Sequence, residues 1–199
     1  AHSDGYIGFG ATASGTAANN LNTGLTTSRP LLAPYWDDIS GAGGVNPSIG
    51  TYATTGLPGS RILTVEFLNW RVFWNGPNAL SFQVKLYEAT GVVEFIYRQE
   101  GIPTASTASV GITAAATGAG NFLSLSDVTA APTVSSATET TAINAIPATN
   151  QVYTFTPPVA PSAPTTLTFS AVTNNSMSLD WVDATGEVGY IVERSLDGI

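Results

Sequence analysis

Two adjacent aspartates, Asp37 and Asp38, have the residue type and the setting that could bind a metal ion. They follow an aromatic-rich run and precede the Gly-rich sequence Ser40-Gly-Ala-Gly-Gly, and carboxylate oxygens on such a loop suit Ca²⁺. The pattern favours a second interpretation, in which the two carboxylates cap turns or accept backbone N–H bonds, because the spaced Asp-x-Asp-x-Asp-Gly order of a calcium loop is absent. Asp37 and Asp38 are therefore the candidate calcium ligands, and no other cofactor is expected.

Trp70, Phe73 and Trp74 form a group of aromatic residues that could contact a ligand. Exposed aromatic rings stack on sugar rings or anchor a protein partner, whereas buried rings belong to an ordinary core. Trp70 and Trp74 have the same parity, so one face of a strand could carry both, although Asn75-Gly76-Pro77 can bend the chain directly afterwards. Trp70 and Trp74 are the candidate contact residues for a polysaccharide or a partner chain.

Residues able to catalyse a reaction are few in this chain. His2 is the single histidine and there is no cysteine, which excludes a cysteine nucleophile and a histidine-rich metal centre. Glycoside hydrolysis needs two carboxylates across a cleft. Glu66, Glu88 and Glu94 lie on or near predicted strands, but Glu66 and Glu94 occupy alternating outward positions, as solvated charges do. We therefore assign no catalytic residue and expect a protein that binds or builds rather than an enzyme.

Charge and composition narrow the range of partners. The chain carries 14 acidic and six basic residues, for a net charge of -8, and the basic residues are scattered rather than clustered, so nucleic acid is not an expected partner. No apolar run approaches the roughly 20 residues that span a bilayer, so membrane insertion is not expected. The absence of cysteine and the scarcity of lysine in a Thr- and Asn-rich chain are typical of bacterial exported proteins. The predicted location is extracellular or at the cell surface.

The elements that position these residues are predicted to be strands throughout. Hydrophobic residues make up 43% and charged residues 10% of the chain, against roughly 25% charged in an average protein. Thr, Ser, Ala, Asn and Gly replace the missing charge, and these residues favour strands and turns. Short alternating runs separated by turn residues predict an antiparallel β-sandwich. The predicted strands are 6–9, 31–36, 51–54, 62–73, 80–88, 92–97, 108–113, 121–125 and 151–156.

A proline-rich segment divides the chain. The stretch between Gly101 and Ala148 is almost uncharged, and we assign it to the first domain with long polar loops rather than to a disordered linker. Residues 157–164, Pro157-Pro-Val-Ala-Pro-Ser-Ala-Pro164, are typical of a stiff polyproline-like linker. The predicted domains are therefore 1–156 and 165–199, separated by the linker 157–164.

The C-terminal segment carries three motifs in a fixed order. They are Pro164-Thr-Thr-Leu-Thr-Phe-Ser, Ser176-Met-Ser-Leu-Asp-Trp181 and Gly189-Tyr-Ile-Val-Glu-Arg194. This segment resembles the first half of a fibronectin type III domain, in which the motifs mark strands A, B and C. The resemblance implies a partial immunoglobulin-like sandwich over residues 165–199, with the later strands missing. Such a half-sandwich leaves Leu179, Trp181 and Tyr190 uncovered, so we expect it to be unstable in isolation.

The N-terminal region carries four further motifs. They are Ser3-Asp-Gly-Tyr-Ile-Gly-Phe-Gly, Leu32-Ala-Pro-Tyr-Trp-Asp-Asp38, Phe82-Gln-Val-Lys-Leu-Tyr87 and Gly91-Val-Val-Glu-Phe-Ile-Tyr97. With these motifs residues 1–156 are similar to the NIDO-type module of adhesion proteins. In modules of this kind a further strand precedes the Asp-Gly-Tyr turn, so we expect the N-terminal strand to be missing and the chain to begin and end within domains.

Together these features predict a structural or adhesive module of a secreted or cell-surface bacterial protein. The expected partners are other protein chains, including copies of the chain itself, which would assemble into an extracellular fibre by sharing strands. The alternative is a carbohydrate-binding accessory module of a larger secreted enzyme, based on Trp70, Trp74 and the acidic Gly-rich loop. A Thr-rich surface that binds ice or mineral ranks last, because no regular Thr-x-Thr array is present.

Overall fold

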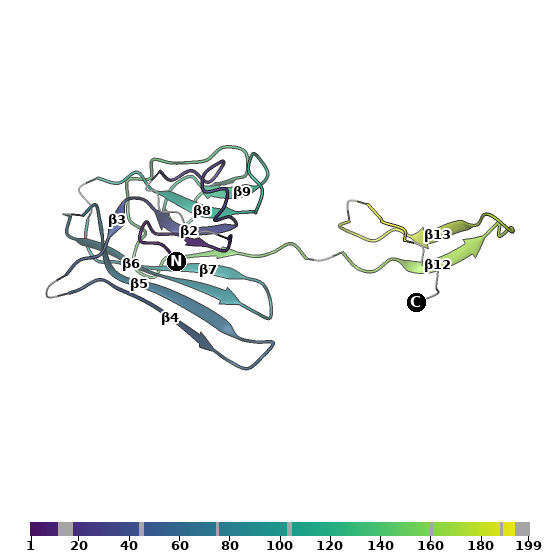
Figure 1. The fold of residues 1–199 in the computed structure, drawn as a ribbon, viewed down its shortest axis with the longest axis horizontal. Coiled ribbons are helices and arrows are strands. Elements are labelled where there is room, and N and C mark those ends of the chain that lie inside the picture. Colours follow the sequence, from purple (N-terminus) through teal and green to yellow (C-terminus); the bar gives the residue numbers. More distant parts are fainter. Residues whose placement is uncertain are drawn as a thin grey trace. The chain divides into compact units, whose positions relative to one another are not determined.

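The protein is all-β in its computed structural model (Figure 1). The structure describes residues 1–11, 18–43, 46–74, 76–102, 105–159, 161–187 and 189–193, and these residues contain no helix. It therefore shows no helix long and apolar enough to cross a membrane within that part of the chain. Two compact units are present, Ala1–Thr156 and Pro157–Ile199. Gly44, Asn75, Ala160 and Arg194, which lie in segments interpreted above, fall outside the described residues.

The first unit contains a five-stranded antiparallel sheet of short strands. Its spatial order is β1-β2-β8-β9-β10. The strands are β1 (Ile7–Gly8), β2 (Leu31–Trp36), β8 (Ser109–Thr113), β9 (Phe122–Leu125) and β10 (Val134–Ser135). Three of these strands, β8, β9 and β10, come from the nearly uncharged stretch between Gly101 and Ala148, so this stretch supplies part of the smaller sheet.

A second, larger sheet lies against the first (Figure 1). Its order is β11-β7-β6-β5-β3, and β4 also pairs with β5. The strands are β3 (Ile39–Ser40), β4 (Ile49–Thr55), β5 (Ile62–Val72), β6 (Asn78–Tyr87), β7 (Val93–Gln99) and β11 (Val152–Phe155). The predicted hairpin is confirmed, because Phe82, Val84 and Leu86 of β6 pair with Tyr97, Phe95 and Val93 of β7.

The core lies between the two sheets. Phe67, Phe82 and Tyr97 stand side by side on the inner face of the larger sheet, with the Phe67 and Phe82 rings stacked 4.6 Å apart. Residues of β2 and β8, such as Tyr35 and Val110, cover them from the smaller sheet. Successive side chains of a strand point to opposite faces of the sheet, so every second residue of these strands points into the core. The predicted antiparallel sandwich is thus confirmed.

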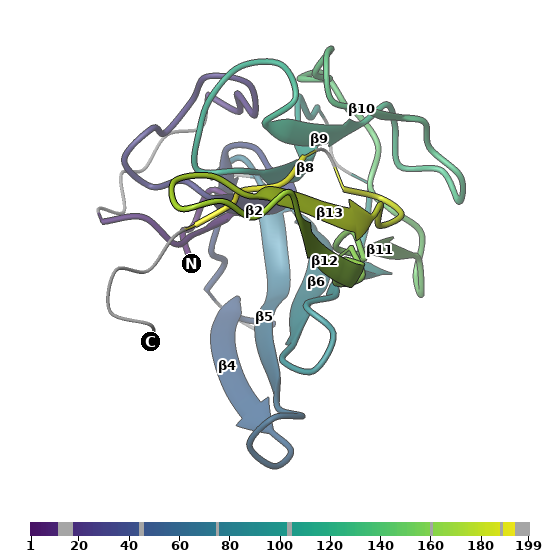
Figure 2. The ribbon, with the colours of Figure 1, turned by 90° about the vertical axis from the view of Figure 1, so that its right-hand side faces the viewer.

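β4 and the adjoining part of β5 project beyond the rest of the first unit (Figure 2). All seven residues of β4 are exposed, and the facing residues Ile62–Glu66 of β5 are half-buried. The projection arises because β5 has eleven residues whereas the strands of the opposing sheet have two to six. The smaller sheet therefore cannot cover the larger one along its full length.

The second unit is a two-stranded antiparallel hairpin. β12 (Thr165–Ser170) pairs with β13 (Ser178–Val182). The third strand that the fibronectin type III resemblance predicts at Gly189–Arg194 is not formed in the described residues 189–193, and Arg194 lies outside them. The partial immunoglobulin-like sandwich therefore stays a prediction, supported by one hairpin.

Candidate binding surface

Asp37 lies in a buried polar network. Its side chain is at the end of β2 and the residue is 2% exposed. Asp37 Oδ2 accepts hydrogen bonds from the Ser106 hydroxyl at 2.8 Å and the Thr107 N–H at 2.9 Å, and Oδ1 accepts the Asp38 N–H at 2.8 Å. The Tyr35 hydroxyl is 2.6 Å from Ser106 Oγ, and burial raises its pKa, so it stays neutral. The carboxylate thus ties β2 to residues 106 and 107.

This geometry supports the interpretation of Asp37 as a structural carboxylate. Asp38 is half-buried, and its carbonyl accepts the Phe73 N–H at 2.7 Å. Among the described residues no group of three or more His, Asp or Glu side chains is placed to hold a metal ion. Calcium binding by Asp37 and Asp38 stays a prediction, and the Asp37 oxygens that it needs already accept protein donors.

Trp70 and Trp74 do not share a strand face. β5 ends at Val72, and Phe73 follows with a φ of 60°, in the left-handed region. A bulge in the β5–β6 register, with Asn69 at a φ of 58°, also interrupts the alternation next to Trp70. The parity argument is therefore wrong, because it assumes a regular strand. Trp74 is 76% exposed, whereas Trp70 is half-buried against Phe67, with ring centroids 5.2 Å apart.

Trp70 lines a hollow of about 250 Å³ beside the projecting hairpin, which is formed by β4 and the adjoining part of β5. Tyr52, Val65 and Phe67 also line it, together with His2 of the N-terminal segment. His2 is held in place, with its ring stacked 5.0 Å from Tyr6 and its Nδ1 3.3 Å from Asp4 Oδ2. The hollow therefore combines aromatic walls with a polar margin, which is an arrangement able to hold a sugar ring.

The three glutamates considered above for hydrolysis are engaged in separate contacts. Glu66 Oε1 accepts Gln83 Nε2 at 2.8 Å, and Glu94 Oε2 accepts the Tyr87 hydroxyl at 2.6 Å. Glu88 binds the Arg61 guanidinium and accepts the Gly59 and Arg61 backbone N–H groups. The hydrogen bond from Arg61 is the main cause that lowers the pKa of Glu88 to about 2. The Glu88 contacts anchor the loop between β4 and β5, and the three glutamates bond to three different side chains.

β4 is the longest strand at a sheet edge in the described part of the first unit. The other edge strands β1, β3 and β10 have two residues each and β11 has four. β4 pairs with β5 through seven consecutive residues without a register shift. Natural edge strands are protected by charges, proline, bulges or shortness. The sequence Ile49-Gly-Thr-Tyr-Ala-Thr-Thr55 has none of these features.

The hydrogen-bond pattern identifies which backbone groups face this edge. The Glu88 N–H donates to the Arg61 carbonyl at 2.9 Å, and successive residues of an antiparallel strand bond to opposite neighbours. Leu63, Val65 and Phe67 therefore bond to β6, and the residues between them bond to β4. Through the β4–β5 register, Gly50, Tyr52 and Thr54 turn their N–H and C=O groups away from β5. We call this row the β4 edge.

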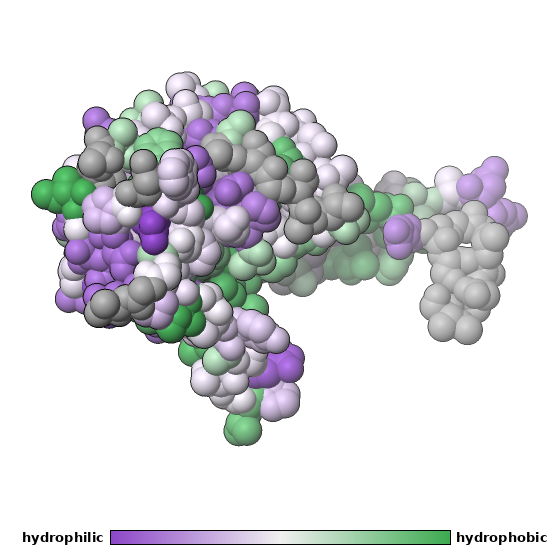
Figure 3. Space-filling model, turned by 60° about the vertical axis from the view of Figure 1, so that its left-hand side comes forward, coloured by the Kyte–Doolittle hydropathy of each residue, from purple (hydrophilic) through white to green (hydrophobic). Residues whose placement is uncertain are grey.

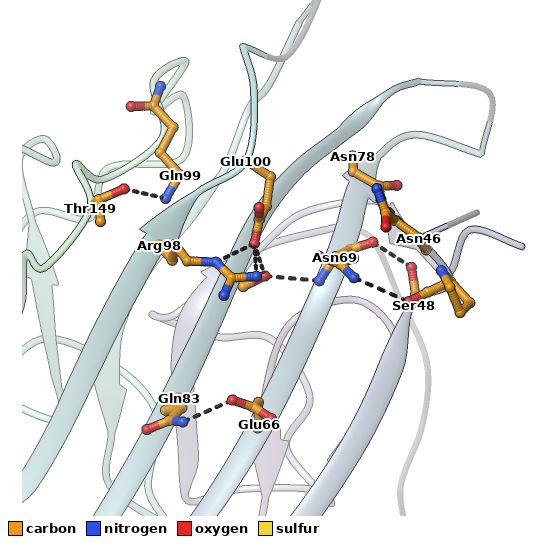
Figure 4. A network of polar contacts seen from close by, with 12 residues as sticks. Asn46, Ser48, Glu66, Asn69, Asn78, Gln83, Arg98, Gln99, Glu100 and Thr149 are labelled. Carbon is orange, nitrogen blue, oxygen red and sulfur yellow. Dashed lines mark hydrogen bonds and ion pairs between the residues drawn. The ribbon is translucent and has the colours of Figure 1, made fainter. Parts of the chain in front are cut away.

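Polar contacts fix the base of the projecting hairpin (Figure 4). Ser48 Oγ donates to the Asn69 carbonyl at 2.6 Å, and the Asn69 N–H donates to Ser81 Oγ at 2.8 Å. Ser81 Oγ also bonds to Glu100, which accepts the Arg98 Nε at 2.7 Å. This chain of bonds joins β5, β6 and β7 at the bulge. The base of the projecting hairpin, which carries the β4 edge, is therefore fixed by hydrogen bonds.

Apolar side chains accompany the β4 edge on the inner face of the sheet. Leu63, Leu86 and Val93 are half-buried and line a hollow of about 460 Å³ with Thr54. Tyr52 is 80% exposed on the same face. Hydrophobic surface is visible at the tip of the projection and where it meets the body of the unit (Figure 3). A partner at the edge could contact these side chains as well as the backbone.

Tyr52 and Ser106 were not among the site residues expected from the sequence. A signal for Tyr52 was present, since the run 49–55 is rich in strand-forming residues but lacks a consistently apolar face, which is typical of a strand exposed on both sides. Ser106 gave no signal, because its contact with Asp37 joins residues far apart in the sequence.

The fold and this surface define residues 1–156 as an antiparallel β-sandwich with one long open edge. Residues 1–157 match the family described as NIDO related, and the chain belongs to that family. This agrees with the NIDO-type resemblance and indicates an adhesion-type module. No curated protein and no solved structure matches the chain.

Proposed function

We propose that this chain is an adhesive or structural module of a secreted or cell-surface bacterial protein, and that it binds other protein chains by strand addition at the β4 edge. The observation that carries the proposal is this edge, a seven-residue exposed strand without charge, proline or bulge. An extended peptide added there gains main-chain hydrogen bonds, and neighbouring side chains supply specificity. Membership of the NIDO-related family supports an adhesive role.

A binding role rather than catalysis also agrees with the engaged carboxylates. Glu66, Glu88 and Glu94 each bond to a different partner side chain. Two hydrolytic acids would instead face one another across a cleft. The absence of enzymatic activity in this chain is part of the proposal.

A second candidate function is carbohydrate binding, favoured by the hollow of Tyr52, Trp70 and His2. Two aromatic side chains supply stacking surfaces, and the imidazole supplies a polar group. This site replaces the pair Trp70 and Trp74, because Trp74 does not line the hollow.

The proposal is tested by displaying the 199-residue chain on a non-adherent host cell. Adhesion is measured to a serum-protein surface, a mucin surface, a dextran surface and other displaying cells. We expect adhesion that Tyr52→Pro abolishes, because proline removes the outward N–H of Tyr52 but no β4–β5 bond. Tyr52→Phe keeps this donor and is the matched control.

Several outcomes separate the two candidate functions. Adhesion by the native chain that Tyr52→Pro leaves intact overturns strand addition, as does a native chain that adheres to none of the four surfaces. Binding that is confined to dextran, inhibited by soluble dextran and lost in Trp70→Ala favours the carbohydrate site instead.

A further inference from the structure

We propose that the β4 edge pairs with the β4 edge of a second copy of the chain, in antiparallel orientation about a two-fold axis at Tyr52. The inference rests on the proposed function and names its partner. It follows from the spacing of the outward backbone groups, which belong to Gly50, Tyr52 and Thr54 and are centred on Tyr52, the middle residue of Ile49–Thr55.

The backbone groups of two such edges are complementary. Antiparallel pairing about Tyr52 places Gly50 of one copy opposite Thr54 of the other, and Tyr52 opposite Tyr52. Each of these three opposed pairs exchanges two N–H···O=C bonds, which gives about six bonds in all. The two larger sheets then form one continuous sheet through the two-fold axis, and the interface is isologous.

The side chains of the strand are also compatible with themselves. Residues 49–55 carry no charge, so no like charges face each other within the new strand pair. The opposed side chains are aromatic, β-branched or small, and such pairs stabilise antiparallel strands. The Tyr52 side chain, 80% exposed in the single chain, meets its symmetry mate on the inner face. A second copy is the occupant that we infer, because the uncharged strand meets its own copy without like-charge repulsion and the exposed Tyr52 ring gains a partner at the axis.

Charges nearby do not oppose this pairing directly. Arg61 at the hairpin tip is neutralised by Glu88 at 2.6 Å, and Glu66 is bonded to Gln83 on the outer face. The net charge of -8 on each chain nevertheless repels a second copy over a longer range. Salt screens such repulsion between exposed charges, so dimerisation should strengthen as the salt concentration rises.

The interface is expected to be weak in solution. One edge strand from each copy supplies less area than the roughly 1,200–2,000 Å² of a standard interface. Many copies on one surface would nevertheless bind strongly to another such surface, because linked sites raise the effective concentration. Weak pairing between single chains is therefore compatible with an adhesive role.

The experiment is sedimentation velocity on the 199-residue chain over a wide concentration range. We expect a monomer–dimer equilibrium in the native chain. Tyr52→Lys and Tyr52→Glu each place like charges opposite one another at the axis and should raise the dissociation constant roughly tenfold or more. An equimolar mixture of the two variants places opposite charges there and should restore a dimer.

Thr55→Lys is the matched control, because residue 55 is exposed on the same strand but its two copies lie at opposite ends of the paired strands. It should dimerise like the native chain. Hydrogen exchange supplies a second measurement, in which the Gly50, Tyr52 and Thr54 amides become slower as the native chain is concentrated.

The proposal is overturned if the native chain stays monomeric at every concentration, or if dimers persist in Tyr52→Lys and Tyr52→Glu alone. Failure of the mixture to restore a dimer also overturns it. If displaying cells adhere through the β4 edge to the serum-protein or mucin surface but not to one another, and the soluble chain stays monomeric, strand addition holds and self-pairing fails. The two proposals are thereby separated.

Discussion

The first unit, with its sandwich, and the second unit, with the hairpin of β12 and β13, contain similar aromatic pairs in different surroundings. Tyr6 and Trp36 have ring centroids 5.1 Å apart and are almost fully buried, whereas Trp181 and Tyr190 are also 5.1 Å apart but only half-buried. The ring contact is present in both units. Because hydrophobic stabilisation depends on the area removed from water, we expect the same ring contact to stabilise the second unit less than the first.

The same contrast holds for the aliphatic residues. Side chains on the inner faces of the first unit are covered by the opposing sheet, apart from those near the projecting hairpin. In the second unit an apolar groove of about 650 Å³ remains open on the hairpin. It is lined by Leu167, Phe169, Leu179, Trp181, Tyr190 and Val192, among others. We therefore expect mutations to have much larger effects in the first unit.

A matched pair of substitutions tests this contrast most strongly. Phe82 is 2% exposed and Phe169 is 61% exposed. Phe82→Ala should lower the free energy of unfolding of the first unit by about 3–5 kcal/mol, through lost burial and a cavity. Phe169→Ala should lower the stability of the second unit by less than about 1 kcal/mol. Urea unfolding monitored by hydrogen exchange measures the stability of each unit separately. Equal losses of stability in the two variants would contradict the expected difference between the units.

The next effect concerns the buried polar network of the first unit. Asp37→Ala removes the acceptor of the Ser106 hydroxyl and the Thr107 N–H, and should destabilise the unit by about 2–3 kcal/mol because buried donors lose their partner. Asp38→Ala is the control and should cost less, since Asp38 is half-buried. Thermal unfolding with and without added Ca²⁺ measures both variants. A calcium-dependent rise in Tm that Asp37→Ala abolishes would favour the metal site instead.

The smallest effect is expected at low pH. The pKa of Glu88 is lowered to about 2 from the ordinary 4.5, mainly by the hydrogen bond from Arg61. A lowered pKa means that this contact stabilises the folded state above about pH 4.5 and that the contribution is lost as the pH falls towards 2. Because Glu88 is exposed to solvent, the change should be small.

Glu88→Gln replaces the titrating carboxyl group by an amide, so the stability of the first unit no longer depends on the protonation of residue 88. The variant should show a shallower loss of stability between pH 4.5 and 2 in urea unfolding, while the hydrogen exchange of the second unit stays the same. An acid response identical to that of the native chain would show that the Arg61 contact does not contribute.

Local patterns determined most of the strands. Alternating residues predicted the hairpin of β6 and β7, and the same pattern predicted β11 as Gln151–Thr156. Such predictions succeed because the inward and outward positions of a strand depend only on neighbouring residues. They failed at Trp70 and Trp74, where the bulge at Asn69 and the left-handed Phe73 interrupt the period.

The sequence by itself determined the all-β class, the alternation of most strands and the resemblance to the NIDO-type module. Only the tertiary structure decided that Asp37 meets Ser106 and Thr107, and that β4 lies at an edge with Tyr52 exposed. The physical reason is that a strand's alternation is a local property, whereas its position in a sheet depends on pairing between distant segments. The open edge, and with it the proposed binding surface, is a consequence of which strands remain unpaired.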